Sequence, residues 1–177
     1  MGRMDPMLLR LFQGQILLQF KFMILAAQQI NDGLKQQDIN GTFYGIQNLL
    51  DAAANAAKAL WGSGPNFPPE RKYVRESIGV QDDSPLKLVK MRNNYEHYDE
   101  RLDRWSRDSK NHNHFDLAIM PSGTVGLDVN DMFRVFDPAT TSLTYWGQEF
   151  NIQALINEVQ RILPKLTEEA NKPLWVK

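Results

Sequence analysis

The feature that most constrains the fold is a run of apolar side chains between Pro85 and Asp108 that repeats with a helical period. Its members keep spacings of three and four residues, and they are Leu88, Met91, Tyr95, Tyr98, Leu102 and Trp105. Such spacing places all of them along one face of an α-helix. Ser84 would cap this helix, with Pro85 at its first position. We therefore predict one continuous helix over residues 85–108, with a polar face opposite its apolar seam.

A second long helix is predicted from Met7 to about Ile30, and apolar residues cover most of its circumference. A helix that is apolar nearly all round must be covered on more than one side, and in a small domain a partner subunit would supply that cover. Lys21 and several glutamines interrupt the segment, which makes a membrane span costly. Asp5-Pro6 stands where a signal peptide would need a basic start. We expect a buried or interface helix and no membrane association.

The rest of the chain predicts two further long helices, one short helix and a few strands. The helices cover residues 43–61, which follow Asn40-Gly41-Thr42, and residues 70–78 and 151 onward. Gly62 and Gly79 would end the first two, and Pro164 would end or kink the third. Apolar runs predict strands at 115–120, 132–136 and 143–146. The expected fold is therefore mainly α: a helical bundle of four main helices in a single domain, residues 1–177, with a small β hairpin inserted between helices three and four.

Composition and charge narrow the functional classes. The formal net charge is -1 and the sequence pI is about 6.3, whereas a protein that coats many phosphates is usually basic. Any contact with nucleic acid is therefore expected at a small local site. The chain has no cysteine, which excludes a disulfide-stapled secreted fold and any thiolate metal site. A cytoplasmic location is expected.

The strongest candidate for chemistry is the segment 91–99 on the predicted helix 85–108. At about 100° of rotation per residue, Asn93 and His97 lie almost opposite the apolar seam, and they are neighbours because they are four residues apart. Arg92 lies about a quarter turn from the seam centre. This face has two interpretations. It is either a solvated surface, on which Arg92 pairs with Glu96, or a surface that meets a substrate or a second subunit.

Arg92-Asn93 followed by His97, with four residues between the arginine and the histidine, resembles the motif of the HEPN family, the higher eukaryotes and prokaryotes nucleotide-binding domains. The resemblance implies an α-helical bundle that carries the motif on a late helix. Many members are metal-independent ribonucleases that act as dimers, with motif residues of two subunits lining one cleft. Some toxins of the family, paired with a nucleotidyltransferase antitoxin, carry a modified tyrosine two positions after the histidine. Asp99 stands there in this chain, so that tyrosine is not carried over.

Carried over residue by residue, the resemblance implies a role for each motif side chain. His97 would act as general acid or base on the ribose 2′-hydroxyl or the leaving oxygen, since histidine has an unperturbed pKa of about 6.5. Arg92 would neutralise charge on the phosphate, and Asn93 would orient His97 or bond the phosphate. Arg101 and Arg104 are expected to bind the substrate. No metal and no cofactor is expected, because the 2′-hydroxyl supplies the nucleophile and leaves a 2′,3′-cyclic phosphate end.

The expected partners follow from the same resemblance. One copy supplies a single His97, whereas acid–base cleavage works best with two titrating groups, so a homodimer would complete the cleft with a second His97 and Arg92. RNA or a nucleotide would be the ligand. A cognate antitoxin is expected if the protein serves bacterial defence or a toxin system. The alternative is a non-catalytic module of the same bundle type that binds a nucleotide, RNA or a partner protein through this face.

Three other groups of residues have a functional and a structural interpretation. His112 and His114 could share a strand face and bind a metal, but no third ligand is evident nearby and a polar loop also explains them. Several aromatics could stack nucleobases or belong to the core: Trp61, Phe67, Tyr73, Trp105, Tyr145 and Trp146. Arg71, Lys72 and Arg75 could contact phosphate or lie in solvent.

Overall fold

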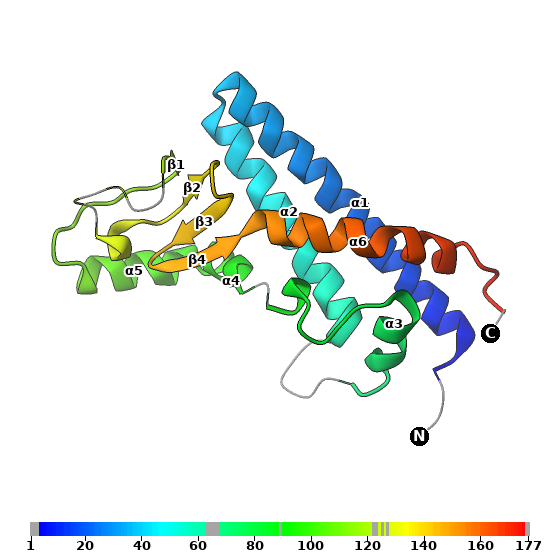
Figure 1. The fold of residues 1–177 in the computed structure, drawn as a ribbon. Helices are drawn as coiled ribbons and strands as arrows, with labels where there is room; N and C mark the ends of the chain where they lie inside the picture. The colour runs from blue at the N-terminus through cyan, green and yellow to red at the C-terminus, as the bar shows by residue number, and fades with distance from the viewer. Residues whose placement is uncertain are drawn as a thin grey trace. The chain divides into compact units, whose positions relative to one another are not determined.

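The computed structural model of the chain is mainly helical and contains a small mixed β-sheet (Figure 1). It describes residues 4–62, 68–88, 90–121, 124, 126 and 128–175. The chain divides into two compact units. The first consists of Met1–Ala27, Asn48–Val89 and Leu155–Lys177, and the second of Gln28–Gln47 and Lys90–Ala154. The single domain over residues 1–177 stays a prediction.

The helices follow the periodicity of the sequence closely at most of their ends. Their bounds are α1 Pro6–Gln36, α2 Ile39–Trp61, α3 Arg71–Ile78, α4 Met91–Glu96, α5 Tyr98–Asp108 and α6 Ile152–Ala170. Two short 3₁₀ segments, η1 and η2, cover Pro85–Leu88 and Val129–Asp131. The predicted helix over 70–78 is confirmed, and Gly79 ends it in the left-handed conformation with a φ of 72°. α1 continues for six residues beyond the predicted end at Ile30.

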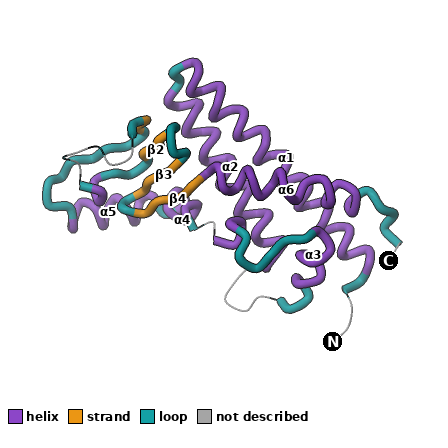
Figure 2. Tube along the Cα trace, viewed as in Figure 1, coloured by secondary structure: helices purple, strands orange, loops and turns teal. Residues whose placement is uncertain are grey.

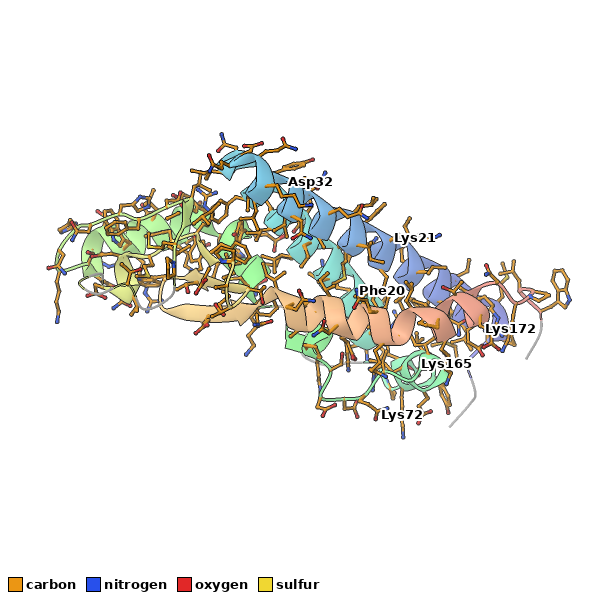
Figure 3. The ribbon with its side chains drawn as sticks, turned by 45° about the horizontal axis from the view of Figure 1, so that its top comes forward. Phe20, Lys21, Asp32, Lys72, Lys165 and Lys172 are labelled. Carbon is orange, nitrogen blue, oxygen red and sulfur yellow. The ribbon has the colours of Figure 1, made fainter. Side chains whose placement is uncertain are left out.

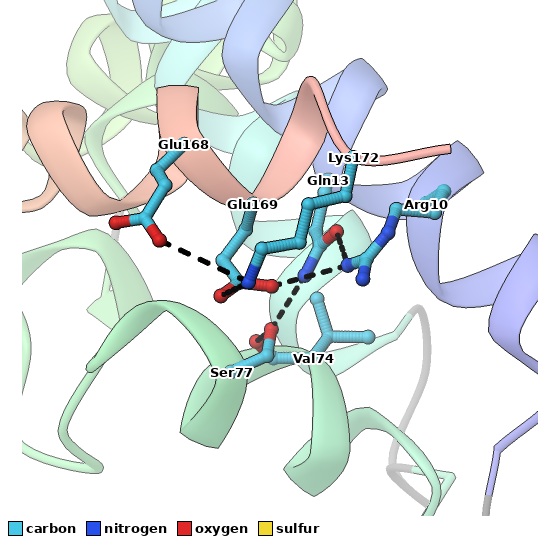
Figure 4. A network of polar contacts seen from close by, with 7 residues as sticks. All are labelled: Arg10, Gln13, Val74, Ser77, Glu168, Glu169 and Lys172. Atoms are coloured by element: carbon cyan, nitrogen blue, oxygen red, sulfur yellow. Dashed lines mark hydrogen bonds and ion pairs between the residues drawn. The ribbon is translucent and has the colours of Figure 1, made fainter. Parts of the chain in front are cut away.

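A polar network inside the first unit joins α1 to α3 and α6 (Figure 4). The buried Arg10 guanidinium donates to Gln13 at 2.6 Å and to Glu169 at 3.2 Å. The Gln13 amide in turn donates to the Ser77 hydroxyl at 2.8 Å. Lys172 Nζ also belongs to this network and pairs with the Glu169 carboxylate at 2.5 Å. These bonds satisfy polar groups that a buried helix face could not otherwise tolerate.

Two sequence predictions in the first unit are corrected. Ser84 does not cap a long helix, because its hydroxyl donates to Glu158 at 2.7 Å and only a 3₁₀ turn follows at Pro85. Pro164 was predicted to end or kink the last helix, and it does not end it, since α6 runs through it to Ala170. Tertiary packing of the apolar face of α6 outweighs the local cost of the proline.

The second unit contains a four-stranded sheet in the order β1-β2-β3-β4 (Figure 2). The strands are β1 Ala118–Ile119, β2 Val135–Asp137, β3 Ser142–Tyr145 and β4 Gln148–Asn151. β1 and β2 are parallel, and the two later pairs are antiparallel. The predicted β hairpin is therefore one part of a larger sheet. β4 was missed because its polar residues lie at the exposed edge and show little apolar alternation.

The apolar seam of the predicted helix 85–108 packs against this sheet. Tyr95 contacts Tyr145 and Tyr98 contacts Phe133, each at 5.8 Å between ring centroids. Trp105 also reaches Phe133, at 6.0 Å. The inward direction predicted for Tyr95, Tyr98 and Trp105 is thus confirmed, whereas the side chain of Leu88 lies outside the described part of the chain.

The prediction of one continuous helix over residues 85–108 is wrong. A 3₁₀ turn covers its start, and α4 and α5 are separate at His97, whose φ of -109° and ψ of 39° are not helical. Hydrogen bonds nevertheless continue on both sides, since the His97 N–H donates to the Asn93 carbonyl and the Arg101 N–H to the His97 carbonyl. Each short helix places its own tyrosine on the sheet, so packing overrides the periodic sequence.

Among the described residues, one helix is long and apolar enough to cross a membrane by length and composition. This is α1, and 33% of its most apolar window is buried within the chain. Core helices and signal sequences meet the same criterion. The expectation of no membrane association and a cytoplasmic location stays a prediction.

The turn between α1 and α2 depends on a close helix approach at Gly33. A Cβ atom on Gly33 would lie 2.7 Å from the Thr42 backbone nitrogen. The Gly41 N–H donates to the Asp38 carboxylate at 2.9 Å and holds the first turn of α2. A side chain at position 33 would therefore push the two helices apart.

Gly33→Ala is expected to lower the free energy of unfolding by about 2 kcal/mol, because the methyl group overlaps backbone atoms that cannot rotate away. Urea denaturation followed by circular dichroism measures the change. Gly14→Ala in the same helix is the matched control, since its Cβ would meet open space. It should raise stability by about 0.5–1 kcal/mol. Equal effects of the two substitutions would contradict the close approach.

Candidate functional site

Two of the three motif side chains are exposed on α4 and at its junction with α5. Asn93 is exposed, and the His97 side chain is 52% exposed. The Arg92 side chain is less accessible, at 20%, and its guanidinium forms an ion pair with Glu96. This pair is the contact expected for a solvated helix face. The structure therefore exposes Asn93 and His97, whereas Arg92 is partly covered and already engaged.

His97 has a carboxylate of its own. Its Nδ1 atom lies 3.2 Å from the Glu100 Oε1 atom. A carboxylate on one ring nitrogen fixes the orientation of an imidazole and selects the nitrogen that carries the proton. Such a base with an orienting partner is one half of an acid–base site. Glu100 follows His97 by three residues, a spacing at which helical side chains are neighbours.

Asn94 was not singled out from the sequence, yet it is the buried polar residue of the motif segment. Its Nδ2 atom donates to the Gln148 side chain at 3.0 Å, and its Oδ1 atom accepts from Arg101 Nε at 3.2 Å. Arg101 is therefore fixed to the base of α4 and is half-buried. The sequence offered one signal for this role of Asn94: it follows Met91 by three residues and so lies on the inner side of the helix.

Arg104 lies farther along α5 and stacks on an aromatic ring. Its guanidinium carbon is 4.7 Å from the centroid of Trp146, and its Nε atom is 3.5 Å from Asp108. Trp146 and Gly147 form the two-residue loop between β3 and β4, both with positive φ. A tryptophan is uncommon at such a backbone position. Both Arg101 and Arg104 are thus held in place by the second unit itself.

An ion pair between Arg134 and Asp116 contacts Tyr98, a residue of the apolar seam. Arg134 Nε donates to Asp116 at 2.7 Å, and Tyr98 Oη donates to the same carboxylate at 3.3 Å. Burial alone would raise the pKa of Asp116, but hydrogen bonds to Arg134 and its positive charge outweigh burial and hold the pKa below its usual range. Burial and the Asp116 charge raise the pKa of Tyr98. Asp116 thus joins Tyr98 to Arg134, the residue before β2.

The other histidines lie around Trp105. The rings of His112 and His114 are 5.7 Å and 5.1 Å from that of Trp105, between centroids. Among the described residues no three His, Asp or Glu side chains form a group that could hold a metal ion. These contacts support the interpretation of residues 111–114 as a polar loop packed on an aromatic side chain.

The remaining aromatic and basic candidates are mostly engaged within the chain. Trp61 and Tyr145 are buried and cannot stack a base from solvent. Arg71 lies over the Phe12 ring at 3.5 Å, and Arg75 donates to the Leu60 carbonyl at 2.9 Å. Phe67 lies outside the described residues.

The chain matches no protein-family model, no curated protein and no solved structure. The HEPN resemblance therefore rests on Arg92, Asn93 and His97 alone and stays a prediction.

Asp116→Asn is expected to lower the free energy of unfolding by about 2 kcal/mol at pH 7, because Arg134 loses its partner in a half-buried site. The pKa of Asp116 is lowered in the folded state, so the pairing stabilises the fold above the unfolded pKa of about 4. That contribution is lost as the pH falls through the lowered pKa. Urea denaturation at pH 7, 5 and 3 measures the difference between wild type and variant, which should shrink toward pH 3.

Asp108→Asn is the control, since Asp108 pairs with exposed arginines on α5. Its effect should stay below about 0.5 kcal/mol. The prediction is contradicted if the difference in the free energy of unfolding between wild type and Asp116→Asn does not change with pH. The carboxylate charge of Asp116 would then not stabilise this part of the fold.

Proposed function

We propose that this chain is a dimeric, metal-independent endoribonuclease of the HEPN type, built on a helical bundle. The observation that carries the proposal is the pair of exposed motif residues Asn93 and His97, of which His97 is an imidazole held by a carboxylate, with Arg92 five residues before it. The pairing of His97 with Glu100 at 3.2 Å supports its role as the proton-transfer group.

The proposed reaction is an internal transfer at phosphorus. The ribose 2′-oxygen attacks the phosphorus atom as a base removes its proton, and the bond to the 5′-oxygen breaks as an acid protonates that oxygen. The products are a 2′,3′-cyclic phosphate and a 5′-hydroxyl. Glu100 engages Nδ1 of His97, so we assign proton transfer to Nε2. Histidine suits both steps because it exchanges protons near neutral pH.

Arg92 is the group we assign to the developing charge on the phosphate oxygens. Its guanidinium presents N–H donors in a fixed planar fork that matches the oxygens of a phosphate. Glu96 holds the fork in place before substrate binds, and phosphate then competes with it. Arg101 and Arg104 are assigned to the flanking nucleotides, with the guanidinium of Arg104 stacked on Trp146 as a flat surface for a base.

A second copy completes the proposed site. One imidazole cannot act as base and acid in the same step, and an arginine does not release its proton at ordinary pH. A second His97 from a two-fold partner would supply the missing group. We place such an enzyme in the cytoplasm, in a defence or toxin system with a cognate antitoxin.

The second candidate is a non-catalytic module that binds RNA or a nucleotide through the same face. The observation that favours it is the pairing of Arg92 with Glu96 and of His97 with Glu100. An acidic neighbour weakens the attraction of such a group for phosphate, which suits weak binding better than transition-state stabilisation.

Incubation of the purified protein with end-labelled RNA in EDTA tests the proposal. Wild type is expected to cleave RNA, whereas His97→Ala and Arg92→Ala should each lose at least about 100-fold in rate, the usual contribution of a general acid or base. Arg107→Ala is the matched control, because Arg107 is an exposed α5 arginine outside the motif. Its rate should stay within about twofold.

Two results would reject the enzyme. One is cleavage that EDTA abolishes, and the other is an undiminished rate in His97→Ala purified in the same way. RNA binding without cleavage, weakened in Arg92→Ala, would support the binding module instead.

A further inference from the structure

An exposed apolar stripe runs along α1 within the first unit. Six large apolar side chains on this helix are each 43–55% exposed: Met7, Leu8, Leu11, Leu18, Phe22 and Leu25. Together with exposed Gln15, five of them follow spacings of three, four, three, four and three from residue 8 to residue 25. This is the spacing of a helix that packs against another helix along a narrow seam. We call residues 8, 11, 15, 18, 22 and 25 the α1 seam.

The α1 seam is distinct from the face by which α1 joins its own unit. Phe20 is fully buried, whereas the neighbouring Lys21 lies on the outer side of the helix (Figure 3). The inner face also includes Ile16 and Met23, both fully buried. The core of the unit is therefore complete without the seam, and the seam is a second apolar surface on the same helix.

The size of this surface indicates that another molecule covers it. Six half-exposed side chains offer on the order of 500 Å², near the upper end of apolar patches on ordinary monomers. With the polar side chains that flank them, the area approaches the roughly 800 Å² per partner of a standard interface.

We propose that a second copy of this chain covers the α1 seam, with the two α1 helices antiparallel and crossing near Gln15. In this register Leu8 of each copy lies against Phe22 of the other, Leu11 lies against Leu18, and the two Gln15 amides meet at the two-fold axis. The seam from residue 8 to residue 22 is thus complementary to itself, as an isologous interface requires. Two side-chain amides can hydrogen-bond to each other at such an axis.

The position of Lys21 favours the antiparallel pair of helices over a parallel pair and over a membrane surface. Lys21 is the one ionised side chain on the exposed face of α1 between Asp5 and Asp32. A parallel pair would set it beside its mate, while the antiparallel pair separates the two lysines by about 18 Å along the axis and opposes the helix dipoles. A membrane surface would favour many Lys and Arg residues beside the apolar stripe, which a single lysine does not provide.

The cysteine-free chain allows a direct test of the register. Gln15→Cys should form a disulfide-linked dimer under mild oxidation, because its Cα atoms would lie within about 7 Å. Leu8→Cys or Phe22→Cys alone should not, since each residue lies about 21 Å from its mate in the antiparallel pair. An equimolar mixture of Leu8→Cys and a size-tagged Phe22→Cys should give the mixed dimer. Self-linking of both single variants, or no linking of Gln15→Cys, would overturn the register.

The mass in solution tests the interface itself. Wild type should be a dimer by light scattering at micromolar concentration, and Leu18→Glu should raise the dimer Kd by about 100-fold. Tyr44→Glu is the matched control, because Tyr44 is a large exposed side chain of α2 outside the seam and should leave the dimer intact.

A monomeric wild type that floats with anionic phosphatidylcholine–phosphatidylserine vesicles would show a membrane face instead and reject the proposal. A monomer without vesicle binding, or a dimer that Leu18→Glu leaves unchanged, would reject it too. None of these readouts depends on RNA cleavage, so the seam and the nuclease can fail separately.

Discussion

The aromatic contact between α4–α5 and the sheet determines the rest of the second unit. Tyr95 on Tyr145 of β3, and Tyr98 on Phe133 just before β2, hold the two short helices in place. Because one face of each helix is committed to these rings, the opposite face must meet solvent or a ligand. The outward direction of Asn93 and His97 is therefore a consequence of core packing rather than of any property of the motif itself.

Periodicity was enough to predict much of this arrangement, and tertiary contacts explain the remainder. The seam of apolar residues predicted the face of Tyr95 and Tyr98 correctly, and spacing alone predicted the Arg92–Glu96 pair. The interruption at His97 could not be predicted, because it depends on how two short helices meet one sheet. The stacking of Arg104 on Trp146 joins residues 42 positions apart, and no local pattern relates them.

The charges around Arg92 and His97 determine how strongly the outward face can attract RNA. Arg92 and His97 each have an acidic neighbour within one helical turn. These acidic side chains and the overall charge of -1 give little long-range attraction for RNA. Catalysis on such a face would depend on short-range contacts, in which phosphate displaces Glu96 from Arg92 and a second copy supplies the missing proton-transfer group.

The chemical nature of the RNA ends tests the nuclease assignment most directly. Mass spectrometry of a short RNA after incubation with the protein in EDTA distinguishes the mechanisms without reference to rate. Attack by the 2′-hydroxyl, with His97 moving the protons, predicts fragments that end in a 2′,3′-cyclic phosphate and begin with a 5′-hydroxyl. Fragments with a 3′-hydroxyl and a 5′-phosphate, or an RNA that stays intact, would contradict the assignment.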